Sequence, residues 1–182
     1  IAIWLEDTQG NYLSTVYVTH KIATQSWQAS GGNRRKEALP HWCYSRGVKY
    51  DDGLYLPTKK EPLIDGISGA TPHESFNIKL NPATALKKFV VKIEINHSTD
   101  FNEAFPKSAK DGEANYSGGK EGSGQPAIVY AANVDLSSGE KSFEANLMGH
   151  SSPDGSSGEV NKDTSGLTTA LHIVKRITVI IQ

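Results

Sequence analysis

The feature that most constrains the fold is a stretch of alternation near the middle of the chain. Over residues 87–95, every second side chain is apolar and the positions between are mostly charged: Phe89, Val91, Ile93 and Ile95 alternate with Lys88, Lys92 and Glu94. Successive side chains of a β-strand point to opposite faces, so this pattern predicts a strand with one buried face. A chain built from such strands needs a second layer to cover that face.

Other segments carry the same signal, and together they predict about seven strands. They are residues 1–5, 12–19, 75–80, 87–95, 125–136, 141–148 and 171–181. Turn residues at Gly10 and Asn11 and at 137–140 predict two hairpins. Because no helices alternate with these strands, we expect an all-β fold, an antiparallel β-sandwich of the immunoglobulin or fibronectin-like kind. An open barrel is the alternative. No repeat or linker divides the chain, so residues 1–182 are expected to form a single domain.

Residues 20–62 depart from the strand pattern and predict a long aromatic-rich insertion. Two tryptophans and three tyrosines are scattered through this stretch without a period of two: Trp27, Trp42, Tyr44, Tyr50 and Tyr55. Five aromatic side chains bury too much surface to stay solvated, so we expect an ordered excursion. A helical turn is predicted over 34–38, and Pro40 limits how far it can extend.

Composition excludes several functional classes. The net charge is −1, which argues against general nucleic-acid binding. The longest apolar runs, around residues 89–95 and 177–181, are too short to span a bilayer. Cys43 is the single cysteine, so no disulfide can form within the chain. The chain opens at Ile1 without a signal-like segment, and we expect it to be a processed piece whose targeting segment lies outside it.

Histidines are the first candidates for chemistry, but their spacing fits no metal motif. Four of the six fall at strand ends or in loops, where three could converge: His20, His73, His97 and His150. Ordinary surface histidines are the favoured interpretation. His41 and Cys43 are close in sequence, which is no indication of a catalytic pair. The acidic loop at 154–163 lacks the register of a calcium loop.

Residues 65–71 carry the sharpest motif in the chain. Their sequence, Asp-Gly-Ile-Ser-Gly-Ala-Thr, resembles the D-x-x-[ST]-G-A-T flavinylation motif of bacterial FMN-binding domains. The resemblance implies covalent attachment of FMN to Thr71 by a flavin transferase, with recognition by Asp65, Ser68, Gly69 and Ala70. Pro72 and His73 depart from that motif, and a tight connection allowed by Gly66 and Gly69 is the alternative interpretation.

A wider resemblance covers almost the whole chain in order. It rests on residues 2–7, 17–19, 37–40 with Trp42, 65–72, 124–126, 149–151 and 167–170. These segments resemble the DUF2271 family of bacterial proteins, which are predicted to be periplasmic and have no established reaction. The resemblance implies an exported protein, periplasmic or at the cell surface, near membrane-bound PepSY-type proteins and flavin transferases.

Three functional hypotheses follow. The first is a non-catalytic accessory or binding module of an extracytoplasmic redox system, whose recognition surface is formed by residues 20–62 and the loops at 96–124 and 150–168. The second is an electron carrier with FMN on Thr71, stacked on Trp42 or Tyr44. The third is a metal-dependent enzyme built from loop histidines. Trp42, Tyr44, His73 and His150 are the candidate surface residues.

Overall fold

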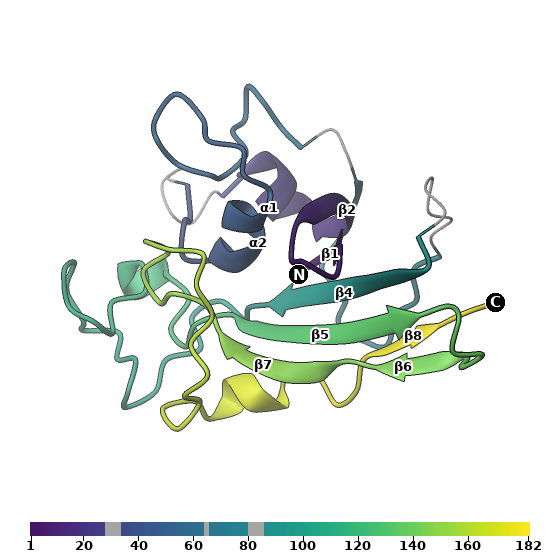
Figure 1. Ribbon diagram of the computed structural model, residues 1–182. Coiled ribbons are helices and arrows are strands. Elements are labelled where there is room, and N and C mark those ends of the chain that lie inside the picture. Colours follow the sequence, from purple (N-terminus) through teal and green to yellow (C-terminus); the bar gives the residue numbers. More distant parts are fainter. Residues whose placement is uncertain (28–33, 64–65, 80–85) are drawn as a thin grey trace.

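A six-stranded sheet runs through the centre of the protein (Figure 1). The computed structural model describes residues 1–27, 34–63, 66–79 and 86–182. The strand order is β3-β2-β1-β4-β5-β7, and neighbours are antiparallel except β2 and β3, which are parallel. The strands are β1 (Ala2–Glu6), β2 (Tyr12–Thr19), β3 (Ile67–Gly69), β4 (Lys88–Ile95), β5 (Ile128–Asp135) and β7 (Asn146–His150).

One face of this sheet packs against a small two-stranded sheet. β6 (Ser142–Glu144) and β8 (Thr178–Ile180) pair antiparallel to form it. The alternating apolar residues of β4 belong to the same core cluster as Phe143 of β6, and Val179 of β8 packs against that cluster. The alternation in residues 87–95 therefore predicts the buried face of β4 correctly.

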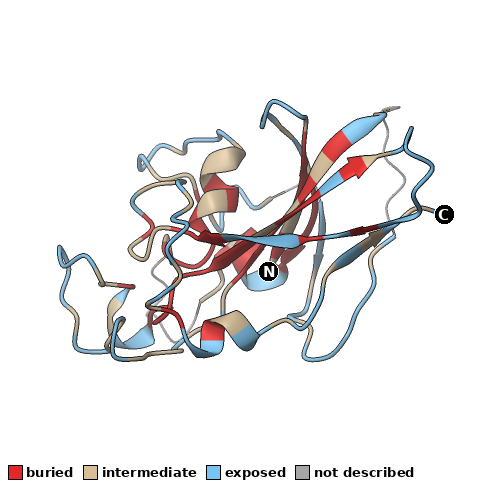
Figure 2. Ribbon diagram, turned by 60° about the horizontal axis from the view of Figure 1, so that its bottom comes forward, coloured by how far each residue is buried: buried red, intermediate tan, exposed pale blue. Residues whose placement is uncertain are grey.

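The opposite face of the sheet packs against two short helices and the segments around them. These are α1 (His20–Thr24) and α2 (Pro40–Ser45). Trp4 and Val18 of the sheet share a core cluster with Leu39, Trp42 and Leu56 of this layer. The described part of the aromatic-rich insertion is thus the second wall of the core, and Figure 2 shows the buried residues concentrated where it meets the sheet.

Helix α2 begins at Pro40, the residue that was expected to limit a helix. Residues 36–37 form a turn and residues 38–39 a bend, and the helix starts at Pro40. Proline is favoured in the first turn of a helix because its missing N–H would have no partner there. The predicted helical turn over 34–38 is therefore wrong, and Pro40 starts a helix instead of ending one.

Several predicted strands need correction. Of the strand predicted over 75–80, residues 75–79 form no strand and Phe76 is 41 % exposed, whereas Leu80 lies outside the described residues. Residues 141–148 do not form one strand alongside β5, because β7 pairs with β5 whereas β6 turns away to pair with β8. The predicted strand over 171–181 shrinks to β8, since the 3₁₀ helix η2 (Thr169–His172) occupies its start. A second 3₁₀ helix, η1 (Gly119–Glu121), lies in the long loop after β4.

The fold is β-rich with few helices, as the sequence predicts in outline. The predicted antiparallel sandwich of seven strands is not confirmed, because the main sheet is mixed and the second sheet has only two strands. Among the described residues, no helix is long and apolar enough to cross a membrane.

Candidate functional site

A cleft of about 640 Å³ opens where two long loops meet at the end of β7. One loop follows β4 and the other follows β7, and both lie at the same end of the sheet (Figure 1). The lining is mostly polar, with one aromatic and a few aliphatic side chains: Phe105, Ala114, His150, Ser151, Ser152, Pro153, Ser157, Glu159, Val160, Asn161, Asp163, Ser165, Gly166 and Leu167.

The loop after β7 folds back because the last residue of that strand pairs with a later one. The backbone N–H of His150 donates to Asn161 at 2.9 Å, and the N–H of Asn161 donates back to His150 at 2.8 Å. Gly149, with φ 141°, allows this approach, because a Cβ there would collide with the Asn161 carbonyl oxygen. This bridge places residues 157–163 beside the side chain of His150.

α2 anchors the same loop from the other side. The Nδ1–H of His41 donates to the Gly158 carbonyl at 2.7 Å, and the Tyr44 hydroxyl donates to the Ser156 carbonyl at 2.7 Å. The Tyr44 ring stacks on Tyr55 with ring centroids 4.3 Å apart. Tyr44 therefore helps to position the loop that lines the cleft. The ring face that stacks on Tyr55 is not free to stack on a flavin.

The buried side chain of Gln125 connects the loop after β4 to Thr168 and Thr169, which follow the last residue of the cleft lining. Its side-chain amide donates to Asp100 at 2.8 Å and to Thr169 at 2.6 Å. Its side-chain carbonyl accepts the backbone N–H of Thr168 at 2.6 Å. Asn102 adds a bond to the Gly166 carbonyl at 2.9 Å, which positions Phe105 at the cleft.

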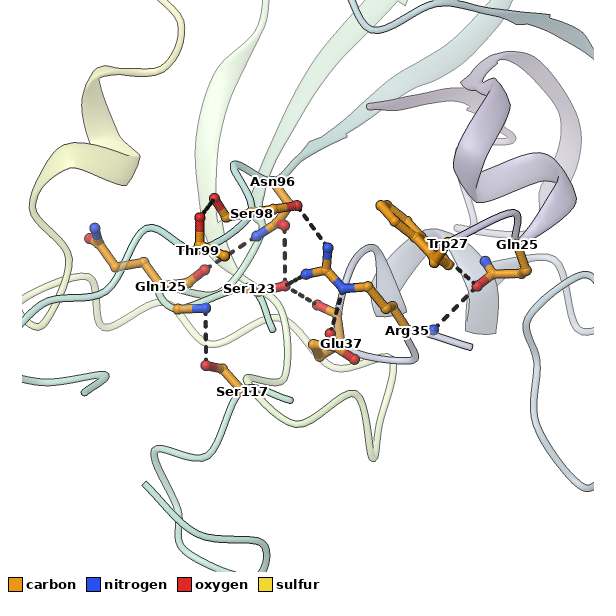
Figure 3. A network of polar contacts seen from close by, with 11 residues as sticks. Gln25, Trp27, Arg35, Glu37, Asn96, Ser98, Thr99, Ser117, Ser123 and Gln125 are labelled. Atoms are coloured by element: carbon orange, nitrogen blue, oxygen red, sulfur yellow. Dashed lines mark hydrogen bonds and ion pairs between the residues drawn. The ribbon is translucent and has the colours of Figure 1, made fainter. Parts of the chain in front are cut away.

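A buried ion pair supports this loop from beneath (Figure 3). The Arg35 guanidinium lies 2.8 Å from the Glu37 carboxylate and donates to the hydroxyls of Ser98 at 2.8 Å and Ser123 at 3.1 Å. The ring of Trp27 covers the guanidinium, with its centroid 4.7 Å away. Because every part of the group is engaged by the protein, we interpret this network as scaffold for the cleft loops.

His150 is the most buried ionisable side chain of the cleft, at 6 % exposure. Its Nδ1 lies 2.8 Å from the Ser151 carbonyl oxygen, which can only accept, so Nδ1 carries the proton. The ring meets Phe105 edge-on, with centroids 6.3 Å apart. Within the described residues, Nε2 has no hydrogen-bond partner, which leaves one polar atom of the cleft open to a ligand.

Asp163 supplies negative charge on the same side of the cleft. The backbone N–H of Ser165 donates to its carboxylate at 3.0 Å. This bond, together with the Ser165 side chain and the neighbouring His150, lowers the pKa of the carboxyl below its ordinary value. Asp163 is therefore ionised at neutral pH.

The flavinylation-like motif lies away from the cleft lining, at the other edge of the sheet. Ser68 and Gly69 belong to edge strand β3, and the Ala70 carbonyl accepts the Tyr17 hydroxyl at 2.6 Å. The side chain of Thr71 is exposed, and so is that of His73. Asp65 lies outside the described residues.

The structure corrects the interpretation of Trp42 as a surface residue. Trp42 is fully buried in the core, and its indole N–H donates to the Thr15 hydroxyl at 3.1 Å. A side chain in that position cannot stack on a flavin. The aromatic in contact with the motif is Tyr17, and the ring of Phe76 lies against it with centroids 5.8 Å apart.

The metal hypothesis gains no support. In the ranges that the structure describes, no three His, Cys, Asp or Glu side chains are grouped so as to hold one metal ion. Of the loop histidines, His150 lines the cleft, and the other three are absent from its lining.

Comparisons with protein-family models, curated proteins and solved structures gave no match for this chain.

The sequence marked His150 as a candidate and the acidic loop at 154–163 only as a rejected calcium loop, so the places of Glu159 and Asp163 in the cleft, and that of Phe105, were not predicted. Each sits in a long polar loop where no periodic pattern marks it. One signal could have indicated the cleft. The two loops follow β4 and β7, which both pair antiparallel with β5, so both loops leave the sheet at the same end and can meet there.

Proposed function

We propose that the protein is a non-catalytic binding module whose cleft holds a small polar ligand. The observation that carries this proposal is the buried His150 ring, with an open Nε2, in a polar cleft of about 640 Å³. Ligand sites of small molecules have volumes of roughly 300–1,000 Å³ and a few placed polar groups. The loops at 96–124 and 150–168, expected to form a recognition surface, both contribute to the lining.

We place this module in an extracytoplasmic redox system, exported to the periplasm or cell surface. The support for this setting is the resemblance of the chain to the DUF2271 family. That resemblance implies a membrane-bound PepSY-type partner and a flavin transferase. We further propose that the β6–β8 sheet and the main sheet act as the two layers of a sandwich, since side chains from both share one core cluster.

A blocking substitution tests the binding module. Ser157 lines the cleft, whereas Ser142 is exposed on β6, outside the lining. Small sugars, amino acids, amines and inorganic phosphate are screened for an increase in Tm of the wild-type protein, Ser157→Trp and Ser142→Trp. We expect at least one class to stabilise wild type and Ser142→Trp, but not Ser157→Trp. Equal stabilisation of all three proteins, or of none, contradicts a ligand site in this cleft.

The second candidate is an electron carrier with FMN on Thr71. The observation that favours it is the exposed Thr71 side chain two residues after edge strand β3, where a transferase can reach the hydroxyl. Bound flavin would supply one- and two-electron chemistry. Of the nearby aromatics, Phe76 is exposed enough to contact a ring system.

Intact mass after co-expression with a flavin transferase tests this candidate. We expect the mass of one FMN to appear on wild type and on Thr8→Ala, which alters an exposed turn. Thr71→Ala should remain unmodified and folded. Covalent flavin on Thr71→Ala, or its absence from wild type, contradicts attachment at Thr71.

A further inference from the structure

We propose that the cleft binds a small organic cation through its ammonium group. This inference rests on the proposed function, because it names the ligand class of the same cleft. It is carried by three independent properties of the lining, namely its charge, the hydrogen-bonding polarity of His150, and the ring of Phe105.

The charged side chains of the lining are carboxylates. Glu159 and Asp163 line the cleft, and the lining residues include no lysine or arginine. Lys162, between them in sequence, is not part of the lining. Both carboxylates are exposed to solvent in the free protein, so neither has to be desolvated before a ligand arrives. A cleft with this charge attracts cations and repels carboxylates and phosphates.

His150 presents an acceptor to the same space. The bond to the Ser151 carbonyl fixes the proton of the neutral tautomer on Nδ1, and in that tautomer Nε2 carries a lone pair. His150 lines the cleft, so a ligand there can donate an N–H to this atom. Carboxylates are acceptors as well, so the ligand should be rich in N–H donors, as an ammonium group is.

Phe105 gives the cleft an apolar side. Its ring is half-buried and lies beside His150. Aromatic faces attract cations, and the ring and Leu167 can pack against the methylene groups of an amine. The cleft volume is also far larger than a bare metal ion needs, which favours an organic cation.

Calorimetric titration of the folded protein tests the inference with defined probes. The probes are putrescine and ethanolamine as cations, glucose as a neutral polyol, inorganic phosphate as an anion, and Zn²⁺ as a bare metal ion. Asp163→Asn removes one charge with little change in volume. Glu140→Gln is the matched control, because Glu140 is exposed in the turn at the opposite end of β5.

We expect an amine to bind wild type and Glu140→Gln alike, and Asp163→Asn about ten- to one-hundred-fold more weakly, as for loss of one charge-assisted hydrogen bond. His150→Gln is a second variant and should also weaken binding.

Binding of glucose, phosphate or Zn²⁺ without either amine overturns the cation inference while leaving a ligand site in the cleft. Equal amine affinity in wild type and Asp163→Asn overturns it as well. Failure of every probe to bind contradicts the binding module itself together with the inference.

Discussion

Glu94 offers the sharpest test of how the layers are held together. It projects from β4 onto the face that packs against the helices and is fully buried. Its carboxylate accepts the backbone N–H of His41 at 3.1 Å and of Trp42 at 2.7 Å, at the first turn of α2. Burial raises the pKa of Glu94 from 4.5 to about 7, even though these hydrogen bonds favour the charged form.

The direction of the resulting pH dependence follows from that raised pKa. Between pH 4.5 and about 7 the folded protein keeps a proton that the unfolded chain has lost, so folding takes up a proton. The stabilisation is complete below the unfolded pKa and is lost as pH rises through the folded pKa. At about 1.4 kcal/mol per pH unit, the contribution of Glu94 should fall by roughly 2–3 kcal/mol between about pH 5 and pH 8.

Glu94→Gln isolates this contribution, because glutamine has the same shape and does not titrate. The free energy of unfolding is measured by urea denaturation at both pH values for wild type, Glu94→Gln and Glu144→Gln, which alters an exposed residue of β6. Contributions from titrating groups that do not interact with Glu94 cancel in the difference between two proteins, whereas the buried N-terminal ammonium group of Ile1 interacts with Glu94 and shares in the difference. Wild type minus Glu94→Gln should decrease with rising pH, whereas wild type minus Glu144→Gln should stay constant. A difference for Glu94→Gln that is independent of pH refutes the reasoning.

Two further predictions concern the scaffold. Arg35→Met should lower the free energy of unfolding by about 3 kcal/mol or more, because Glu37 is left buried without its partner. Lys88→Met, which removes an exposed ion pair at the end of the β4–β5 ladder, should have a much smaller effect in the same urea assay, and equal losses would contradict the scaffold role of Arg35. Burial raises the pKa of the Cys43 thiol well above its ordinary value, so a thiol reagent near pH 8 should label the folded protein far more slowly than the protein in denaturant. Rapid labelling of folded protein would show that the core around α2 opens.

The strands that could be predicted from the sequence have side chains that alternate clearly or a hairpin partner near in sequence. The first hairpin joins neighbouring segments and β4 alternates clearly, and both are confirmed, although the partners of β4 are residues 2–6 and 128–135. Residues 75–79 alternate equally well, yet they form no strand, and no strand of the described residues pairs with them. Alternation indicates which side chains can be buried, whereas a strand also requires a neighbouring strand to pair with.

The polar side of β4 shows a second limit. Lys92 and Glu94 resemble solvent-facing residues in the sequence, but the helical layer covers them. The Glu6 carboxylate lies 3.7 Å from the ammonium group of Lys92, and the N–H groups of α2 engage Glu94. Which charged residues become buried depends on where a distant segment packs, and local pattern does not contain that information.

The residues of the cleft could not be predicted from local sequence patterns either. His150 was a candidate because it stands at a strand end, but its pairing with Asn161 and its contact with Phe105 join segments far apart in sequence. Thr71 belongs to a recognisable sequence motif, whereas no functional motif includes Asp163. Motifs report chemistry that a chain carries on one segment, whereas the cleft is assembled from several.

The most direct test of the binding module is a titration of ¹⁵N-labelled protein with putrescine, followed by amide chemical shifts. The account predicts saturable shifts confined to the cleft, at His150, Asn161, Asp163 and Gly166 with neighbouring Phe105, and little change around Thr71 on β3. Shifts spread evenly over the surface, or clustered at the edge strand β3 and Thr71, would contradict the cleft as the binding site.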